Sequence, residues 1–307
     1  MVRVLTNDGL QKGAINKLTS LGFEVVNNHY DKDELGTTLK EFDILVIRSA
    51  TKVTSDILDQ AQGGKLKLII RAGVGIDNID VLYATQKGIV VKNTPNASSE
   101  SVAELAIGHM FALARFIAIS NCTMRDGQWN KKKYKGIELK GKTLGIIGMG
   151  RIGKALAKKA EALGMKVIYN DMFGKQDELI YEFLELDELL RSSDFISLHV
   201  PYDKEKGYLI GKDQFNIMKD GVYLINCARG KVVEEAALLE ALDNGKVAGA
   251  GIDVFEEEPT KNKALVNHPK VSVTPHIGAA TKEAQERIGE EVVTIISNFI
   301  SNDLGTI

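Results

Sequence analysis

The sequence is poor in cysteine and carries almost no net charge. Only two cysteines occur, Cys122 and Cys227, and they lie far apart in the chain. This number does not suggest a disulfide framework or a metal site, so we expect no bound metal and a reducing cytoplasm as the compartment. The formal charge at pH 7 is −2, which gives no electrostatic reason to expect nucleic acid or an anionic membrane as a partner.

Long uninterrupted apolar runs are also missing. Residues 1–6 form an apolar run that is too short for a signal peptide, and we expect a first strand there instead. The most apolar long segment covers residues 102–119, but Glu104, His109 and Arg115 interrupt it, which disfavours a membrane span. The pattern therefore predicts a buried helix.

The remaining composition is that of an ordinary globular protein, with 44% hydrophobic and 26% charged residues over 307 positions. This length exceeds the usual size of one hydrophobic core, so we expect two domains. Up to Asn96, apolar strand-like segments alternate with helical stretches, which favours a parallel sheet with helices on both faces. The expected strands cover residues 2–5, 23–26, 44–47, 66–70 and 89–91.

A second domain is expected after one long helix over residues 98–125, with Ser98 and Ser99 as candidate caps. Its strands are predicted at residues 144–147, 167–169, 195–199, 222–225, 248–252 and 271–273. The last amphipathic stretch, about residues 282–299, has the length to return to the first domain. The fold class is thus α/β with two doubly wound parallel-sheet domains. We expect a smaller, discontinuous, flavodoxin-like substrate domain from residues 1–96 and 283–307, a Rossmann-type NAD-binding domain over 97–282, and an active cleft between the two.

The chain is organised around a strand, a tight turn and a helix. The glycines Gly148, Gly150 and Gly153 have the spacing GxGxxG, follow an apolar strand and precede apolar residues at helical spacing. The next strand ends in Asp171, 18 residues after Gly153. A βαβ unit with an acidic residue at this distance is typical of dinucleotide binding, and an ordinary strand-to-helix connection is the alternative.

Each part of this unit suits a dinucleotide. Gly148 permits the tight turn, Gly150 lets the backbone approach a pyrophosphate, and Gly153 lets the helix pack closely on the strand. The helix N-terminus offers unpaired N–H groups and a partial positive charge to the phosphates. Because Asp171 would bind the ribose hydroxyls and repel a 2′-phosphate, we expect NAD rather than NADP.

Oxidation of an alcohol by NAD requires a base for the hydroxyl proton, and histidine is the natural base near neutral pH. Among five histidines, His276 is the best candidate, since it follows a strand at the open edge of the second sheet. His199 ends a strand of the same sheet and either lines the cleft or packs at the strand end. A structural role is expected for His29, in a polar stretch, and for His109, in the long apolar helix. His268 lies in a polar segment and is expected at the surface.

Other side chains could assist such a base. Arg229 follows a strand, and its guanidinium can form two hydrogen bonds with a carboxylate. Glu258 precedes a proline, which holds it extended, and a carboxylate beside a histidine orients the ring and raises its pKa. In the first domain, Arg48 and the glycine-rich turn around Gly75 also follow strands, where a small anion can bind. A surface ion pair, a solvated acidic run and plain loops remain the alternatives from the residues alone.

Four motifs, in their order and spacing, resemble the D-isomer-specific 2-hydroxyacid dehydrogenases. They cover residues 148–153, 226–230, 253–259 and 274–279, and the resemblance extends over nearly the whole chain. Within that family the chain is most similar to the members that act on D-3-phosphoglycerate, on the strength of residues 47–51, 71–78, 93–96 and 101–104.

The resemblance implies roles for individual residues. His276 would be the acid/base, Glu258 its partner, and Arg229 the residue that binds the carboxylate and carbonyl side of the substrate. On the substrate side, the implied residues are Arg48, Ser49, Val74, Gly75 and, near a dimer contact, Lys131. On the cofactor side, they are the three glycines with Arg151, Ile152, Asp171, His199, Pro201, Cys227, Ala228, Asp253, Gly278 and Ala279.

The resemblance also implies an activity, the NAD-dependent oxidation of D-3-phosphoglycerate to 3-phosphohydroxypyruvate in serine biosynthesis, by a homodimer or homotetramer. Because the chain stops at Ile307, we do not expect the serine-binding regulatory domain that some members carry. A glyoxylate or hydroxypyruvate reductase is the alternative within the family. An NAD-sensing binding module for transcription factors is a remote alternative, which would need an interaction surface beyond the cleft.

Overall fold

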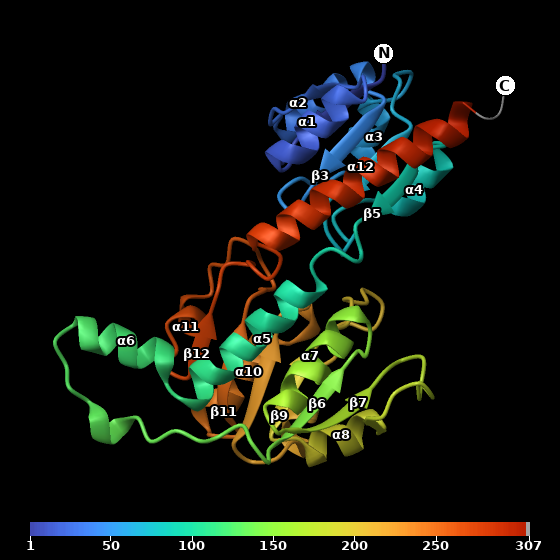
Figure 1. Cartoon of the computed structure of the whole chain (residues 1–307). Helices are drawn as coiled ribbons and strands as arrows, with labels where there is room; N and C mark the ends of the chain where they lie inside the picture. The colour runs from blue at the N-terminus through green and yellow to red at the C-terminus, as the bar shows by residue number, and fades with distance from the viewer. Residues whose placement is uncertain (305–307) are drawn as a thin grey trace. The chain divides into compact units, whose positions relative to one another are not determined.

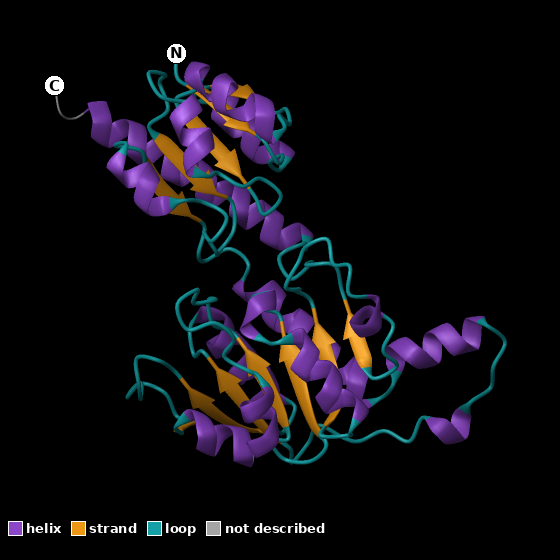
Figure 2. Ribbon diagram, turned by 180° about the vertical axis from the view of Figure 1, so that it is seen from behind, coloured by secondary structure: helices purple, strands orange, loops and turns teal. Residues whose placement is uncertain are grey.

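The computed structural model describes residues 1–304 and divides into two compact units (Figure 1). Unit 1 contains residues 1–98 together with the chain from Ala279 onward, and unit 2 contains Ser99–Gly278. Each unit has one parallel sheet with helices on both faces (Figure 2). The predicted fold class, two doubly wound α/β domains, is therefore confirmed.

Unit 1 has five parallel strands in the order β2-β1-β3-β4-β5, which is the flavodoxin-like order. The strands are β1 (Arg3–Thr6), β2 (Glu24–Val26), β3 (Ile44–Ile47), β4 (Leu68–Arg71) and β5 (Val90–Asn93). The central strand β3 is buried along its whole length, as expected for an apolar run covered on both faces.

Five helices cover the two faces of this sheet. They are α1 (Lys12–Ser20), α2 (Lys32–Thr38), α3 (Ser55–Gln60), α4 (Val81–Gln86) and α12 (Lys282–Leu304). Alternate residues of β1 point to opposite faces, so Val4 packs with α1 and α12, whereas Leu5 packs with α2 and α3. Helices α1 and α12 approach closely, since a side chain on Gly289 would come within 2.8 Å of the Ala14 methyl group.

Unit 2 has seven parallel strands in the order β12-β11-β10-β9-β6-β7-β8. The strands are β6 (Thr143–Ile147), β7 (Lys166–Asn170), β8 (Glu182–Phe183), β9 (Phe195–Leu198), β10 (Val222–Asn226), β11 (Val247–Ile252) and β12 (Val271–Val273). The helices are α5 (Ser99–Ala114), α6 (Ile117–Arg125), α7 (Arg151–Ala162), α8 (Leu186–Ser192), α9 (Lys212–Ile217), α10 (Glu235–Asp243) and α11 (Lys263–Val266). The strand order reverses between β6 and β9, and such a switch point is where doubly wound sheets bind ligands.

The prediction of one helix over residues 98–125 is wrong, because the chain bends by 63° between α5 and α6. Phe116 adopts a left-handed conformation with φ of 55°, which a continuous helix does not allow. Helix α5 is packed in the core of unit 2, whereas no residue of α6 is buried. Among the described residues, no single helix meets the length and apolarity of a membrane span, although α5 and α6 do when they are counted together.

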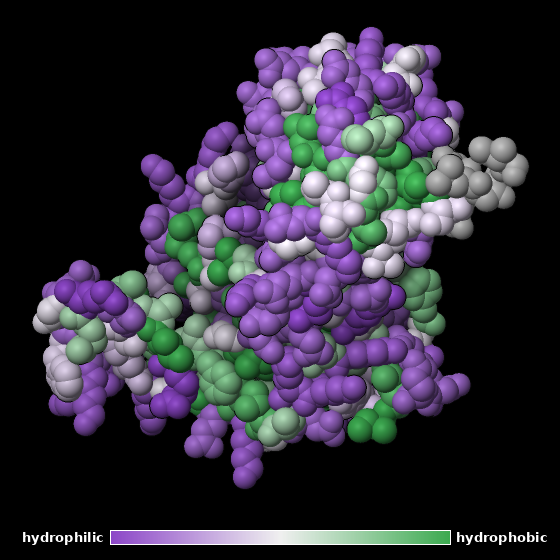
Figure 3. Space-filling model, turned by 45° about the horizontal axis from the view of Figure 1, so that its top comes forward, coloured by the Kyte–Doolittle hydropathy of each residue, from purple (hydrophilic) through white to green (hydrophobic). Residues whose placement is uncertain are grey.

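After α6 the chain continues through a short helical turn (Lys131–Lys133) before it enters β6. We call residues 116–135 the arm, and Figure 1 shows it projecting from the body of unit 2. It exposes apolar side chains, with Ile117 at 53%, Met124 at 52% and Trp129 at 77% of full exposure. Figure 3 shows hydrophobic and hydrophilic residues side by side on the arm.

Candidate active site

The glycine turn between β6 and α7 has three different environments. Gly148 has a φ of 95°, and a side chain there would lie 2.5 Å from the carbonyl oxygen of His199. A side chain on Gly153 would meet the carbonyl oxygen of Gly148, whereas Gly150 faces open space. No side chain caps the N-terminus of α7 within the described residues. The open backbone at Gly150 and the uncapped helix therefore fit the diphosphate of a dinucleotide.

Asp171 lies beside this turn, directly after β7. Its Oδ2 accepts a hydrogen bond from the backbone N–H of Met149 at 2.8 Å, and its Oδ1 accepts one from Phe173 at 3.0 Å. A carboxylate has about four acceptor positions, so two protein donors leave capacity for the hydroxyls of a ribose. The residues present thus fit an adenosine ribose as well as a diphosphate.

Most of the other expected cofactor residues follow strands of the same sheet. Pro201 lies in the loop after β9, Cys227 and Ala228 follow β10, Asp253 follows β11, and Gly278 lies in the loop after β12. Because these strands are parallel and adjacent, their following loops share one edge of the sheet. Ala279 is assigned to unit 1, at the start of its second segment.

His199 combines burial with an unsatisfied nitrogen. Its Nε2 lies 2.9 Å from the Ser197 hydroxyl, while its Nδ1 is buried without a hydrogen-bond partner among residues 1–304. Burial lowers the pKa of the ring to about 4, so the imidazole is neutral near pH 7. A buried neutral ring nitrogen with no protein partner, next to the glycine turn, fits the position of a ligand atom.

His276 and Glu258 form a direct pair. The His276 Nδ1 lies 2.7 Å from the Glu258 Oε2, and the other carboxylate oxygen accepts a hydrogen bond from the backbone of Phe255 at 3.1 Å. Burial, the largest influence, opposes ionisation of Glu258, but His276, Phe255 and the positive charge of Arg229 together outweigh it and lower its pKa. Since a carboxylate only accepts, Nδ1 carries a proton, and Nε2 is left to exchange a proton with a ligand.

The backbone of His276 is held in an unusual conformation by a buried carboxylate. His276 has a φ of 54°, and its N–H donates to the carbonyl of Asp253 at 2.8 Å. Asp253 itself is buried and accepts hydrogen bonds from the N–H groups of Ile277 at 2.8 Å and Gly278 at 2.9 Å, and from the Thr274 hydroxyl at 2.6 Å. Residues with such a φ cluster at functional sites, where the surrounding structure holds them.

Arg229 lies in a loop that contacts the loop of Glu258. Asn226 braces it by donating to the Arg229 carbonyl at 2.9 Å. Gly230 packs so tightly on the backbone of Phe255 that a side chain there has no space. The structure therefore brings the loops of Arg229 and Glu258 together within unit 2, with His276 paired to Glu258.

Cys227 and His109 are both buried in unit 2. Burial, assisted by the charge of Asp253, raises the pKa of the Cys227 thiol, so Cys227 is a neutral lining residue. His109 is buried, as expected, and its ring contacts the hydroxyls of Ser272 at 3.0 Å and Thr274 at 3.1 Å. The expectation of a surface position for His268 is wrong, because its side chain is only 12% exposed, next to Asp243.

The expected substrate residues of unit 1 follow β3 and β4. The backbone N–H of Arg48 donates to Asp8 at 2.7 Å, and its carbonyl accepts from Asn78 at 2.7 Å, so the loop that carries Arg48 and Ser49 is braced from both sides. Val74 is exposed, and within residues 1–304 the N–H groups of Val74 and Gly75 donate to no backbone carbonyl. These two donors are available to an anion.

Lys131 begins the short helical turn of the arm. Among the described residues, no hydrogen bond or ion pair joins it to the loops at the carboxyl edge of the sheet. The structure of one chain therefore does not bring Lys131 to the other candidate residues of unit 2. Reasoning from the sequence assigned no role to Asp8, a polar loop residue that no motif distinguishes, or to Asn78, which ends the motif over residues 71–78.

The model of the D-isomer specific 2-hydroxyacid dehydrogenase NAD binding domain matches residues 107–278, more than half of the chain. A hydroxypyruvate reductase from Thermotoga maritima is 50% identical over 295 residues, covering 95% of this chain and 96% of the relative. A D-3-phosphoglycerate dehydrogenase from Methanocaldococcus jannaschii is 46% identical over 308 residues, covering 99% of this chain but only 58% of the relative. The chain thus spans little more than half the length of the D-3-phosphoglycerate dehydrogenases that it matches.

Among solved structures, a D-lactate dehydrogenase from Aquifex aeolicus complexed with NAD and lactic acid superposes with a TM-score of 0.85 at 34% identity. The superposition covers 99% of this chain and 97% of that one.

Proposed function

The chain belongs to the family of D-isomer-specific 2-hydroxyacid dehydrogenases, and we propose that it oxidises D-3-phosphoglycerate to 3-phosphohydroxypyruvate. The observation that carries this proposal is the 2.7 Å pair of His276 and Glu258 at the carboxyl edge of a sheet whose glycine turn fits a dinucleotide. The matching family domain binds NAD. In the cell the product would feed serine biosynthesis, and the two unpaired cysteines agree with a reducing cytoplasm.

Bound NAD would supply the acceptor for the hydride that leaves C2 of the substrate. The glycine turn with Arg151 and Ile152 would hold its diphosphate, and the Asp171 carboxylate would bind the hydroxyls of its ribose. The other residues expected to contact it are His199, Pro201, Cys227, Ala228, Asp253, Gly278 and Ala279. Asp253 would act indirectly, because its oxygens are occupied by the backbone of the His276 loop.

The proton chemistry would be carried by His276. Its Nε2 accepts the proton of the C2 hydroxyl as the carbon–oxygen double bond forms. Throughout this step Nδ1 keeps its own proton and donates it in the hydrogen bond to Glu258. The ring becomes an imidazolium, and the Glu258 carboxylate, ionised because its pKa is low, stabilises that charge. In the reverse direction the same proton returns to the carbonyl oxygen.

Several hydrogen-bond donors would hold the substrate. Arg229 presents a planar guanidinium that can bind the carboxylate and the carbonyl oxygen with two parallel hydrogen bonds. The backbone N–H groups of Val74 and Gly75 would bind the carboxylate as well. Arg48 and Ser49 would bind the phosphate, and Lys131 would reach it only from a second copy of the chain.

A second copy is part of this proposal. The arm exposes Ile117, Met124 and Trp129, and apolar patches of this kind are typical of contact surfaces. We expect a homodimer or homotetramer in light-scattering measurements. A Trp129→Ser and Met124→Ser variant that remains in the same assembly as the wild type would contradict a contact through the arm.

Reduction of hydroxypyruvate is a second candidate activity. It is favoured by the hydroxypyruvate reductase of Thermotoga maritima, which this chain matches over nearly its full length. Both activities use the same proton chemistry and differ only in the group on C3.

The deciding experiment is a spectrophotometric comparison of phosphohydroxypyruvate, hydroxypyruvate and glyoxylate with NADH and with NADPH. The proposal predicts the highest kcat/KM for phosphohydroxypyruvate with NADH. A preference for hydroxypyruvate would replace the first candidate with the second, and an absence of turnover with all three would overturn the proposed enzyme activity.

A further inference from the structure

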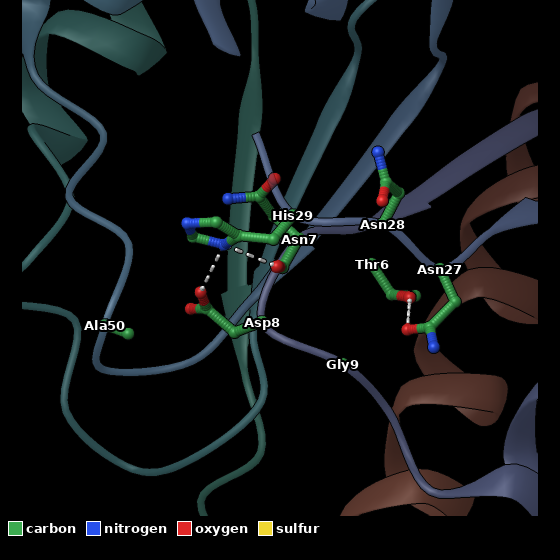
Figure 4. Close-up of a pocket in the computed structure, with 8 residues that line it drawn as sticks. All are labelled: Thr6, Asn7, Asp8, Gly9, Asn27, Asn28, His29 and Ala50. Carbon is green, nitrogen blue, oxygen red and sulfur yellow. Dashed lines mark hydrogen bonds and ion pairs between the residues drawn. The ribbon is translucent and has the colours of Figure 1, made fainter. Parts of the chain in front are cut away.

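Two histidines outside the acid/base pair differ in what their rings contact. His29 lies at the rim of a hollow in unit 1, where its side chain is 58% exposed and its Nδ1 lies 3.0 Å from the carbonyl oxygen of Asn7 (Figure 4). His109 is only 2% exposed, and each of its ring nitrogens lies within hydrogen-bond distance of a hydroxyl group. A buried ring with a protein partner on both nitrogens is held in one orientation.

His109 lies beside the two strands that lead to the acid/base pair. Helix α5 packs against β11 and β12 (Figure 1). The contact with β11 is direct, because a side chain on Gly251 would come within 2.6 Å of the His109 Cβ. The loop of Glu258 follows β11, and the loop of His276 follows β12. A change at His109 is therefore felt first at the carboxyl ends of these strands.

The donors and acceptors around His109 can be assigned from its partners. The Thr274 hydroxyl donates to the Oδ1 of Asp253 at 2.6 Å. A hydroxyl has one proton, so the same oxygen accepts from the His109 Nε2, which lies 3.1 Å away. Burial lowers the pKa of His109, against the opposing charge of Asp253, so the ring is neutral near pH 7. Its Nδ1 then accepts from the Ser272 hydroxyl at 3.0 Å.

Asp253, at the end of this chain of hydrogen bonds, holds the loop of His276. Its carboxylate accepts from the N–H groups of Ile277 at 2.8 Å and Gly278 at 2.9 Å. Its backbone carbonyl accepts from the N–H of His276 at 2.8 Å. His276 has a φ of 54°, which a residue other than glycine seldom adopts without support. Asp253 thus supports the backbone conformation in which the His276 ring pairs with Glu258.

We propose that His109 is a positioning residue for the acid/base, and that it acts on the His276 loop through Thr274 and Asp253. The proposal rests on the proposed function, because only there does His276 exchange a proton with a substrate. The Thr274 hydroxyl has a donor on one side and an acceptor on the other, so the direction in which it donates is fixed. Without His109 that direction is no longer fixed, and Asp253 holds the loop less firmly.

The test is a double-mutant cycle of His109→Leu and Thr274→Val, assayed with phosphohydroxypyruvate, hydroxypyruvate and glyoxylate and with NADH. Leucine has no hydrogen-bonding group, and valine replaces the threonine hydroxyl with a methyl group. Each single variant should lower kcat by about 10-fold for every acid that the wild type reduces, since the base is misplaced. KM and the Kd for NADH should stay within about 2-fold. The double variant should be no slower than the slower single variant, because both changes break the same chain of hydrogen bonds.

Two further variants separate positioning from packing. His109→Gln offers an amide N–H and a carbonyl oxygen in place of the two ring nitrogens, so kcat should return to within about 2-fold of the wild type. Met110→Ala removes a buried side chain at the next position of α5, so it should lower the melting temperature. Its kcat should equal that of the wild type when the rate is divided by the number of NADH-binding sites, counted by fluorescence titration.

The outcomes separate this proposal from the proposed function. Losses in kcat that add fully in the double variant, or an equal loss in Met110→Ala, would overturn the proposal and leave the function standing. If His109→Leu does not fold, Thr274→Val decides by itself, since a wild-type kcat in that variant also overturns the proposal. A wild type that reduces none of the three acids overturns the function and the proposal together.

Discussion

The Nδ1 atom of His276 lies 2.7 Å from the Oε2 atom of Glu258, although the two residues come from loops after different strands. Glu258 follows β11 and His276 follows β12, and these strands are neighbours in the sheet of unit 2. The pairing fixes the protonated nitrogen of the ring and leaves the other nitrogen free for chemistry. It is the arrangement that a histidine needs in order to accept a proton and remain stable as an imidazolium.

His276→Ala tests the assignment of the base. Removal of a general base should lower kcat by a factor of about 10² to 10⁴, whereas NADH binding, measured by fluorescence titration, should be nearly unchanged. Glu258→Gln keeps the size of the side chain but removes the charge that stabilises the imidazolium, so it should give a smaller loss. An unchanged kcat in His276→Ala would remove this residue from the mechanism.

Asp171→Asn tests the choice of cofactor. An amide oxygen can still accept the hydrogen bond from Met149, so the glycine turn should keep its shape while the negative charge is lost. We expect the ratio of kcat/KM for NADPH to that for NADH to rise by about 10-fold, since repulsion of the 2′-phosphate is removed. A ratio that does not change would mean that another residue excludes NADPH.

Arg48→Ala separates binding of the phosphate from binding of the rest of the substrate. The variant should lower kcat/KM for phosphohydroxypyruvate by about 10-fold or more, as expected for loss of a hydrogen bond to a charged group. It should leave kcat/KM for glyoxylate unchanged. Equal losses for glyoxylate and phosphohydroxypyruvate would contradict the role of Arg48.

Much of the fold could be predicted because the central strands of both units are buried on both faces. Such strands are short, continuous apolar runs, and residues 44–47 and 144–147 are clear examples. The break at Phe116 could not be predicted, since the apolar pattern continues through it and no glycine or proline marks it. Strand β8 has only two residues, Glu182–Phe183, and is too short for any periodicity.

The candidate site was harder to predict than the fold. Local chemistry identified the glycine turn and Asp171, because their spacing carries a physical meaning on its own. The contact of Glu258 with His276 depends on the order of the strands in the sheet, so the residues alone left a solvated acidic run as the alternative for Glu258, and the resemblance to a family assigned the pair.

The final prediction concerns stability and pH, and it depends on His199. Burial lowers the pKa of His199 to about 4 in the folded protein, whereas the ring of an unfolded chain has its ordinary pKa of 6.5. Between these values the unfolded chain binds more protons, so protonation favours unfolding. The contribution of the neutral ring to the free energy of unfolding is complete above pH 6.5 and is lost as the pH falls toward 4.

His199→Gln should therefore flatten the pH dependence of the free energy of unfolding between pH 6.5 and 4, measured by urea denaturation without cofactor. The slope of the free energy of unfolding against pH should fall by at most about 1.4 kcal/mol per pH unit, which corresponds to a difference of one bound proton between the unfolded and folded states. His109 contributes in the same direction, because burial lowers its pKa as well, so His109→Gln is the matched comparison. If His199→Gln has the wild-type slope, the ring of His199 takes up protons in the folded state, and its orphaned Nδ1 then has a partner that water or a ligand supplies.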